Sequence, residues 1–427
     1  MNQKHIVWVS IIIGYCIVAA QETSSPVWKF VADKTIRAVN PVNIAGKGVC
    51  ETAVVVSSGT IVSLVKIAGP SAGKPIWNSI MPGPVSLLSN IVCGKTDVIA
   101  AGCQTGGLYF VAPKTGKIVM LFAIIGAPRQ IQTVTNTKSG GRQIIVSSDD
   151  GFVYGFAEPV FVEPYASQNP LWRYRVSGDS TGDFTANHLA DTTRKSACML
   201  QLIGAGKDAG SAALAVSTSP SSLHCLRVPL DTTDRLRELW SISTGDSILA
   251  FSRVPDADSD GVDDVLVSIL PDTLSLYAGK DGQRLWSLHV CNAITNMALR
   301  KAQNDWESTI IGAVDEGGKL YCLGARQESR GFDVRWIFDV RDTNSLSALT
   351  GWPGSDGGFV VGSTANKVYL LSGGGKKLWE AQTGGTVTDI QVLTTANGDN
   401  RPAIFVTDDG GTLVMFHPGV ESTLIVK

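Results

Sequence analysis

Apolar runs separated by glycine-rich turns recur along the chain from residue 53 onward. One unit contains an apolar strand, a turn of small residues, a second apolar strand, a glycine turn and a strand that carries Trp. The clearest copy begins at Asp264 and reads DVLVSILPDTLSLYAGKDGQRLWSL. β-Branched and aromatic residues bounded by Gly, Asn and Asp favour strands joined by tight turns. The pattern therefore predicts a repeated antiparallel sheet.

Eight copies of this unit occur, and their starts lie 44 to 69 residues apart. They begin at Ala53, Asp97, Gln143, Ala212, Asp264, Ser308, Gly358 and Pro402. A period of this size is typical of arrays in which each repeat forms one supersecondary unit. Radial repetition of four-stranded sheets closes into a propeller. We therefore predict an all-β fold, an eight-bladed β-propeller of four-stranded antiparallel blades.

An aromatic residue stands on the last predicted strand of seven copies. These residues are Trp77, Phe122, Trp172, Trp240, Trp286, Trp336 and Trp379. A large aromatic side chain offers much area for burial between neighbouring sheets. Packing between blades is therefore a better interpretation of these residues than a ligand-binding cage.

The last copy ends near Pro418 without a strand that carries Trp. The segment SPVWKF around Trp28 has the missing apolar and aromatic signature. We predict that this N-terminal strand closes the last blade. The alternative is that the tail, residues 422–427, supplies the strand.

The N-terminus has the features of a targeting segment. Lys4 and His5 precede an apolar stretch, residues 6–20, which is shorter than the roughly 20 residues needed to span a bilayer. Small residues at Val18 and Ala20 favour cleavage before Gln21. We therefore expect a signal peptide over residues 1–20, a single propeller domain over residues 21–427, and a secreted or extracellular protein of the secretory pathway. If the segment is not cleaved, it would anchor the chain to a membrane.

Composition narrows the possible functions. Charged residues make up 17% of the chain, hydrophobic residues 44%, and the net charge is −2. Disorder requires low hydrophobicity and high net charge, so the composition excludes it. Proteins that bind nucleic acids usually have an excess of basic residues, which this composition lacks.

The cysteines follow no metal-binding spacing. Seven lie beyond residue 20, and no Cys-x-x-Cys occurs, so a zinc site is a poor interpretation. Isolated strand cysteines are commonly buried as small apolar residues. The secretory route also permits bridges, and aligned positions suggest the pairs Cys198–Cys225 and Cys291–Cys322.

The repeat resembles the β-propeller of pyrroloquinoline-quinone-dependent alcohol dehydrogenases and their non-enzymatic relatives. The residues that carry the resemblance are Leu108-Tyr109 with Thr115-Gly116-Lys117, Asp281-Gly282 with Leu285-Trp286, and Leu378-Trp379. The resemblance covers nearly all of residues 21–427. It specifies the fold better than the function, because one fold hosts many functions.

One loop, residues 256–267, carries plausible metal chemistry. It reads DADSDGVDDVLV, in which Asp256, Asp258 and Asp260 alternate before a glycine, and Asp264 follows. Ca²⁺ prefers six to eight hard oxygen ligands. We therefore predict a structural calcium site formed by these four carboxylates and the backbone carbonyl of Val262. An acidic turn exposed to solvent is the alternative.

The calcium loop resembles those of FG-GAP repeats in integrin α propellers. Together with the propeller and the N-terminal segment, it makes the chain similar to the ectodomains of integrin-α FG-GAP-repeat-containing membrane proteins. The luminal propeller of the largest subunit of the ER membrane complex is a comparable relative. These resemblances imply a propeller without catalytic activity.

Catalytic motifs are scarce. The sequence has no Cys-Cys pair of the kind expected in a quinone enzyme, no Gly-x-Ser-x-Gly and no His-Glu-x-x-His. His224 aligns with Tyr321 and Tyr369, which favours a packed strand residue. We expect a non-catalytic scaffold that binds proteins or glycans through its face loops, most plausibly residues 158–170 and 178–211. The alternative is a pyrroloquinoline-quinone-dependent oxidoreductase.

Overall fold

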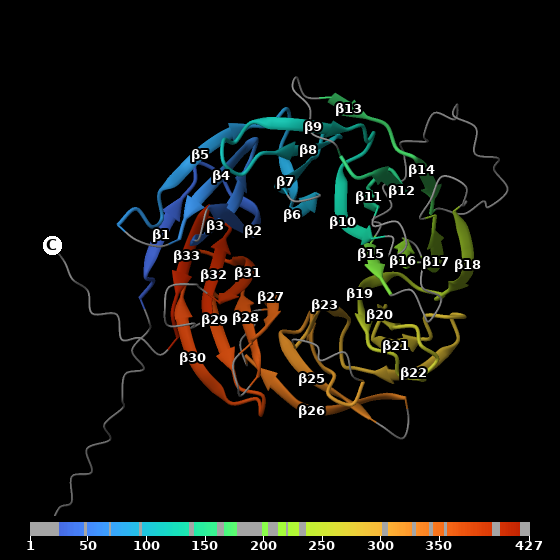
Figure 1. Cartoon of the computed structure of the whole chain (residues 1–427). Coiled ribbons are helices and arrows are strands. Elements are labelled where there is room, and N and C mark those ends of the chain that lie inside the picture. Colours follow the sequence, from blue (N-terminus) through green and yellow to red (C-terminus); the bar gives the residue numbers. More distant parts are fainter. Residues whose placement is uncertain are drawn as a thin grey trace, which may run out of the picture.

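The computed structural model is a ring of β-sheets around a central axis (Figure 1). It describes residues 25–46, 49–67, 70–93, 96–135, 141–159, 166–176, 199–203, 212–218, 221–229, 236–300, 306–326, 330–340, 345–353, 357–394 and 402–418. Regular structure in these ranges consists of 33 strands in eight sheets. No helix among them has the length and apolar character needed to cross a bilayer. The predicted all-β fold of four-stranded antiparallel blades is confirmed.

The innermost strand of each sheet lies beside the central axis. These strands are β2 (Ile36–Gly46), β6 (Val85–Cys93), β10 (Pro128–Thr135), β15 (Met199–Leu202), β19 (Ile248–Val254), β23 (Ile294–Leu299), β27 (Leu346–Gly351) and β31 (Val387–Thr394). Each contacts the innermost strand of the next sheet, and β31 contacts β2. The sheets therefore form a closed ring.

The second and third strands of each sheet form its buried middle. The second strands are β3 (Val49–Ser58), β7 (Thr96–Cys103), β11 (Arg142–Ser148), β16 (Ala212–Thr218), β20 (Asp264–Ile269), β24 (Ile310–Asp315), β28 (Phe359–Ser363) and β32 (Pro402–Asp408). The third strands are β4 (Ile61–Lys66), β8 (Leu108–Val111), β12 (Phe152–Ala157), β17 (Ser222–Val228), β21 (Thr273–Tyr277), β25 (Lys319–Arg326), β29 (Lys367–Leu371) and β33 (Thr412–Phe416). Both faces of these strands meet a neighbouring sheet, so successive residues are buried, as in β20 and β24.

The outermost strands form the rim of the ring. They are β5 (Pro75–Ile80), β9 (Ile118–Phe122), β14 (Trp172–Arg175), β18 (Arg237–Ser243), β22 (Arg284–His289), β26 (Gly331–Asp339), β30 (Lys377–Gln382) and β1 (Trp28–Val31). An apolar cluster fills each of the eight seams between neighbouring sheets. The core is therefore divided among the seams.

The rim aromatics pack across the seams, as the sequence predicts. The indole Nε1 of Trp77 donates to the Pro113 carbonyl at 2.7 Å, and that of Trp240 donates to the Gly279 carbonyl at 2.9 Å. Both carbonyls belong to the turn between the third and outermost strands of the next sheet. A Cβ on Gly282, in the second of these turns, would lie 2.8 Å from the Trp240 ring. Gly282 also has a φ of 74°, so both the close approach and the backbone require glycine there.

The ring is closed by the N-terminal strand, and this prediction is confirmed. β1 pairs antiparallel with β33, with Trp28 opposite Met415, and completes the sheet of β31, β32 and β33. The Trp28 indole donates to the Ile67 carbonyl in the next sheet at 3.0 Å. The closing seam therefore uses the same contact as the interior seams. The alternative closing segment, residues 422–427, lies outside the described residues.

One sheet has a fifth strand. β13 (Ala166–Gln168) comes from the connection between β12 and β14, and it pairs parallel with β9 of the preceding sheet. The backbone N–H of Ala123 also donates to the Gln168 carbonyl at 3.1 Å. This part of the predicted contact loop, residues 158–170, therefore covers a sheet edge of its own chain. Most of the other predicted contact loop, residues 178–211, lies outside the described residues.

Candidate functional site

Charge is segregated between the two faces of the ring. Because strands alternate in direction, the turns between second and third strands lie on one face, and the turns between third and outermost strands lie on the other. With their flanking strand residues, the described turns between second and third strands hold two basic residues, Lys319 and Lys367, and seven acidic ones. The acidic residues are Asp149, Asp150, Asp272, Asp315, Glu316, Asp408 and Asp409. We call this side the acidic face.

The described turns between third and outermost strands are mainly basic. Their acidic residues are Glu158 and Asp281. Their basic residues are Lys66, Lys74, Lys114, Lys117, Arg237, Lys280, Arg284, Arg326, Arg330, Lys376 and Lys377. We call this side the basic face. The loop between β19 and β20, on the same side, is an acidic exception that carries Asp256, Asp258, Asp260, Asp263 and Asp264. A net charge close to zero thus conceals two sets of turns of opposite sign, and charge arranged in this way steers partners of complementary charge.

The predicted calcium loop lies on the basic face, between β19 and β20. The structure brings Asp256, Asp258 and Asp260 together, with one carboxylate oxygen of each within 4.8 Å of the others. Ser259 and Gly261 have φ values of 63° and 92°, which fold the loop tightly around the carboxylates. Burial, and next the charge of Asp260, raise the pKa of Asp258. Hard oxygen donors converging in this way fit the chemistry of Ca²⁺.

Backbone N–H groups of the same loop donate hydrogen bonds to its carboxylates. Asp256 accepts hydrogen bonds from the N–H groups of Asp260 at 3.0 Å and Gly261 at 2.7 Å. Asp260 accepts one from the N–H of Val262 at 2.8 Å. These contacts fix the loop geometry with the carboxylates facing inward.

Asp264 stands apart from the three converging carboxylates. It is fully buried at the start of β20, and its two oxygens accept hydrogen bonds from the N–H groups of Ala257 at 2.7 Å and Gly279 at 3.0 Å. Burial raises its pKa to about 7 against the lowering effect of these two hydrogen bonds. Asp264 therefore ties the loop to the turn between β21 and β22.

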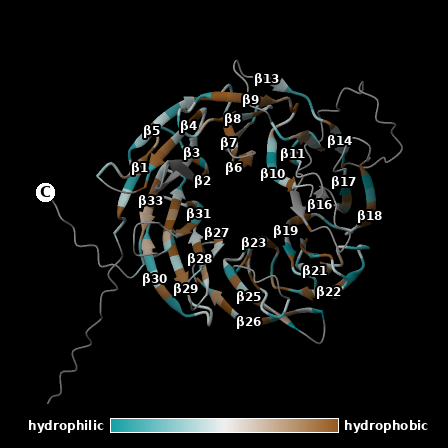
Figure 2. Cartoon of the chain, in the orientation of Figure 1, coloured by the Kyte–Doolittle hydropathy of each residue, from teal (hydrophilic) through white to brown (hydrophobic). Residues whose placement is uncertain are grey.

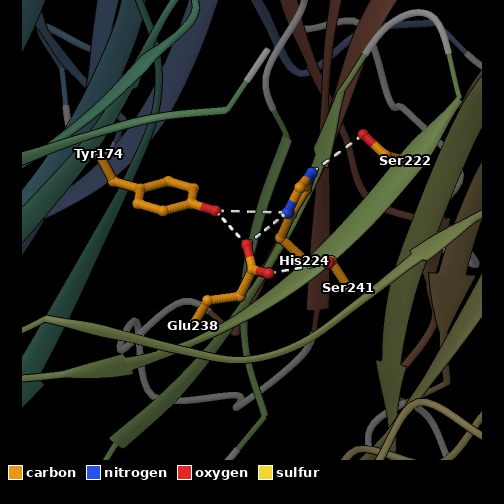
Figure 3. A network of polar contacts seen from close by, with 5 residues as sticks. All are labelled: Tyr174, Ser222, His224, Glu238 and Ser241. Carbon is orange, nitrogen blue, oxygen red and sulfur yellow. Dashed lines mark hydrogen bonds and ion pairs between the residues drawn. The ribbon is translucent and has the colours of Figure 1, made fainter. Parts of the chain in front are cut away.

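A second polar cluster, which we call the seam network, bridges two sheets (Figure 3). Tyr174 on β14 donates its hydroxyl to the Glu238 carboxylate on β18 of the next sheet. His224 Nδ1 lies 2.9 Å from the same carboxylate oxygen, and Ser241 Oγ donates to the other oxygen at 2.8 Å. His224 Nε2 lies 3.0 Å from Ser222 Oγ.

The acceptors of the seam network determine its proton positions. A carboxylate cannot donate, so Nδ1 of His224 donates to Glu238. Burial opposes ionisation of Glu238, but hydrogen bonds from Tyr174, His224 and Ser241 outweigh it and lower the pKa of this carboxyl. The network therefore links two sheets through an ionised carboxylate. Its side chains come from three strands, which the interpretation of His224 as a packed strand residue did not anticipate.

We expect Glu238→Gln to destabilise the protein by about 1 kcal/mol, because it removes charge-assisted hydrogen bonds at a partly exposed site. The folded pKa of Glu238 lies below its ordinary value of 4.5, so its stabilising contribution is present above about pH 4.5 and is lost as the pH falls through the folded pKa. Urea unfolding at pH 7 and pH 3 measures both effects, and the variant should differ from the parent less at pH 3. The neighbouring Arg237→Ala should show no such pH dependence.

The proposed cysteine pairs are wrong. Cys225, Cys291 and Cys322 are free thiols. Cys225 is buried on β17 with its Sγ 3.8 Å from the Gly279 carbonyl, and Cys322 is buried in the middle of β25 opposite Trp336. Burial raises the pKa of Cys225 to about 12. These two residues are therefore packed as small apolar side chains; Cys198 lies outside the described residues.

Comparison with known proteins supports the fold and leaves the family open. No family model matches the chain, and no curated protein matches it in sequence. The solved structure of Sqt1 from Saccharomyces cerevisiae aligns with 92% of this chain and 99% of its own, at 14% identity and a TM-score of 0.70. BamB from Moraxella catarrhalis aligns with 92% of this chain and 99% of its own, at 13% identity and a TM-score of 0.59.

A designed protein, Ika8, shows the same likeness. It aligns with 91% of this chain and 97% of its own, at 12% identity and a TM-score of 0.62. At such low identities the likeness concerns the fold alone. The resemblances to quinone enzymes and to FG-GAP proteins therefore have no support from a matching family.

Proposed function

We propose that this protein is a non-catalytic β-propeller scaffold that binds other proteins through its faces. The observation that carries the proposal is the segregation of charge between the acidic and basic faces of one rigid ring. Turns held by a closed ring of sheets present side chains in fixed positions. Opposite charges on two faces favour different partners, because complementary potential sets specificity and association rate.

Paired charge reversals on the two faces test the proposal. Glu316→Lys with Asp409→Lys alters exposed turns of the acidic face, and Lys114→Glu with Lys376→Glu alters those of the basic face. Each variant and the parent would be cross-linked in the cells that express the protein, and bound proteins identified by mass spectrometry. We expect each pair to abolish capture of one set of proteins and leave the other set bound. Equal capture by parent and both variants would contradict binding through the faces.

The proposal includes the secretory pathway, with residues 1–20 as a cleaved signal peptide. The support is the apolar stretch at residues 6–20, which lies outside the described residues. N-terminal sequencing of the protein from the culture medium should begin at Gln21. An intact N-terminus in the membrane fraction would instead identify a membrane anchor.

We further propose that Asp256, Asp258 and Asp260 bind one structural calcium ion, with the Val262 carbonyl as a further ligand. Asp264, the fifth predicted ligand, would support the site by tying the loop to Ala257 and Gly279. The support is the convergence of three carboxylates within 4.8 Å. The loop precedes β20, whose six residues are all buried. An ion there would fix the entry of the chain into a core strand.

We expect calcium to raise the free energy of unfolding by about 2.7 kcal/mol at a hundredfold excess over Kd, because only the folded state holds the ligands together. Thermal unfolding with calcium or with a chelator measures this effect. The double variant Asp258→Ala, Asp260→Ala should lose it and keep its β-rich circular dichroism. Asp246→Ala, an exposed acidic residue elsewhere, should keep it. If the chelator leaves the parent unchanged, the loop is an acidic turn without an ion.

The alternative remains a pyrroloquinoline-quinone-dependent oxidoreductase. Titration with the quinone, followed by absorbance, distinguishes it from a scaffold. Saturable binding at equal stoichiometry would favour the enzyme.

A further inference from the structure

The rim strands differ in how they are protected from edge-to-edge pairing. An edge strand presents unpaired N–H and C=O groups to any other strand, and natural proteins commonly block such edges with charged side chains or proline, or cover them. The proline of β5, Pro75, stands at its first position and leaves the other end of the strand, around Ile80, without such a residue. Six of the eight outermost strands carry charged residues or histidine. Their sequences are WKFV in β1, WRYR in β14, RELWSIS in β18, RLWSLH in β22, GFDVRWIFD in β26 and KLWEAQ in β30.

The two exceptions are β9 and β5, whose sequences are IVMLF and PIWNSI. β9 is the strand that β13 covers. Figure 2 shows the contrast, with brown residues along β9 and teal residues along β18. The chain thus covers one of its two uncharged rim strands with a strand of its own. In the described residues, β5 ends its sheet.

β5 also exposes apolar side chains. Ile80 is 77% exposed, the highest value among the large hydrophobic residues described, and Ile76 is 47% exposed. The position three residues beyond the rim aromatic, which Ile80 occupies, is filled by Arg175, His289 and Asp339 in other blades. A charged side chain is therefore compatible with this position, and β5 lacks one.

Along its outer side, the backbone of β5 is paired with no strand in the described part of the chain. The N–H of Met81 donates to the Thr60 carbonyl at 2.7 Å, toward β4. Because backbone groups alternate along a strand, Ser79 also points toward β4, whereas Asn78 and Ile80 direct their N–H and C=O groups away from the sheet.

We propose that β5 pairs antiparallel with β5 of a second copy of this chain, about a twofold axis at Ser79. In this register Asn78 lies opposite Ile80 of the other copy, and the outward N–H and C=O groups of both residues form four hydrogen bonds. The two Ile80 side chains lie diagonally across the pair, within the reach of long side chains. No charged residue enters the contact, and the convex rim keeps the neighbouring blades apart. This inference is independent of the proposed function.

Sedimentation velocity over a concentration series tests the pairing. A contact of one strand per copy is small, so we expect a reversible dimer that forms at about 10–100 µM. Ile80→Lys should shift the association at least tenfold toward monomer, because it places two ammonium groups in the contact. Ile337→Lys, on the charged rim strand β26, is the matched control and should dimerise like the parent. A parent that remains monomeric throughout, or equal effects of the two substitutions, would overturn the proposal.

A cross-link tests the register. Two Ser79 residues would face each other as a non-hydrogen-bonded pair, in which Cα atoms lie about 4.5 Å apart, within disulfide range. Ser79→Cys should therefore give a covalent dimer under mild oxidation. The parent, which has the exposed thiol of Cys291, provides the background. If Ser79→Cys gives no more covalent dimer than the parent, the proposed register is wrong. If the protein is monomeric and the backbone amides of Asn78 and Ile80 are protected from hydrogen exchange, another segment pairs with β5.

Discussion

Replacing Trp28 by alanine is expected to lower the free energy of unfolding by about 3 kcal/mol. The substitution removes an indole ring from the closing seam, where a large aromatic residue contributes several kcal/mol when buried. It also removes the hydrogen bond from Nε1 to the Ile67 carbonyl. The Trp28 ring packs beside Phe405, with ring centroids 6.0 Å apart. The midpoint of urea unfolding measures the loss.

Two further variants identify the cause of the effect. Lys29→Ala changes an exposed residue of the same strand and should shift stability by less than about 0.5 kcal/mol. Trp240→Ala removes the equivalent contact from an interior seam and should cost a similar amount to Trp28→Ala. If Trp28→Ala unfolds at the same urea concentration as the parent, β1 does not hold the ring closed.

Phe122→Ala is expected to cost about 4 kcal/mol, the largest effect of a single substitution proposed for this protein. Phe122 is fully buried on β9, stacked on Phe156 of the next sheet at 4.1 Å with an interplanar angle of 11°. It also meets the edge of Phe110 at 4.6 Å. Loss of the ring leaves a cavity between two sheets that cannot collapse without moving strands.

Equilibrium unfolding in urea measures this loss as well. Phe122→Leu keeps most of the volume and should cost about half as much. Ile125→Ala, three residues on and 67% exposed, should leave stability nearly unchanged. An alanine variant no less stable than the leucine variant would show that the aromatic stack does not support the seam.

The repeat could be read from the sequence because each blade uses the same local rules. Apolar runs, glycine turns and a rim aromatic recur at fixed places, so the strands and the role of Trp28 follow from patterning. Such features depend on neighbours in the sequence or on the period of the repeat. The sequence aligns Phe122 with the tryptophans, but in the structure Met120 stands at the tryptophan's place, opposite Phe110, and Phe122 lies two residues further along the strand.

Features that depend on contacts between distant strands could not be read in this way. β13 has the sequence ASQ, which has no strand pattern, and its pairing depends on the open edge of β9. The seam network joins Tyr174 to Glu238, 64 residues apart, and neither belongs to a motif. The spacing of Asp264 fits the series of alternating calcium ligands that the sequence predicts. In the structure it is buried at the start of β20, and its two oxygens accept hydrogen bonds from two backbone N–H groups.

Closure by β1 also sets the timing of folding during synthesis. The partner of Trp28 is Met415, so the first strand of the ring has no sheet to join until almost the whole chain has been made. At about 5–20 residues per second, that delay is on the order of 20–80 s. During this interval β1 has no partner of its own sheet and is available to other strands. A chaperone that shields the emerging N-terminal segment would therefore protect this protein more than one whose first strand pairs locally.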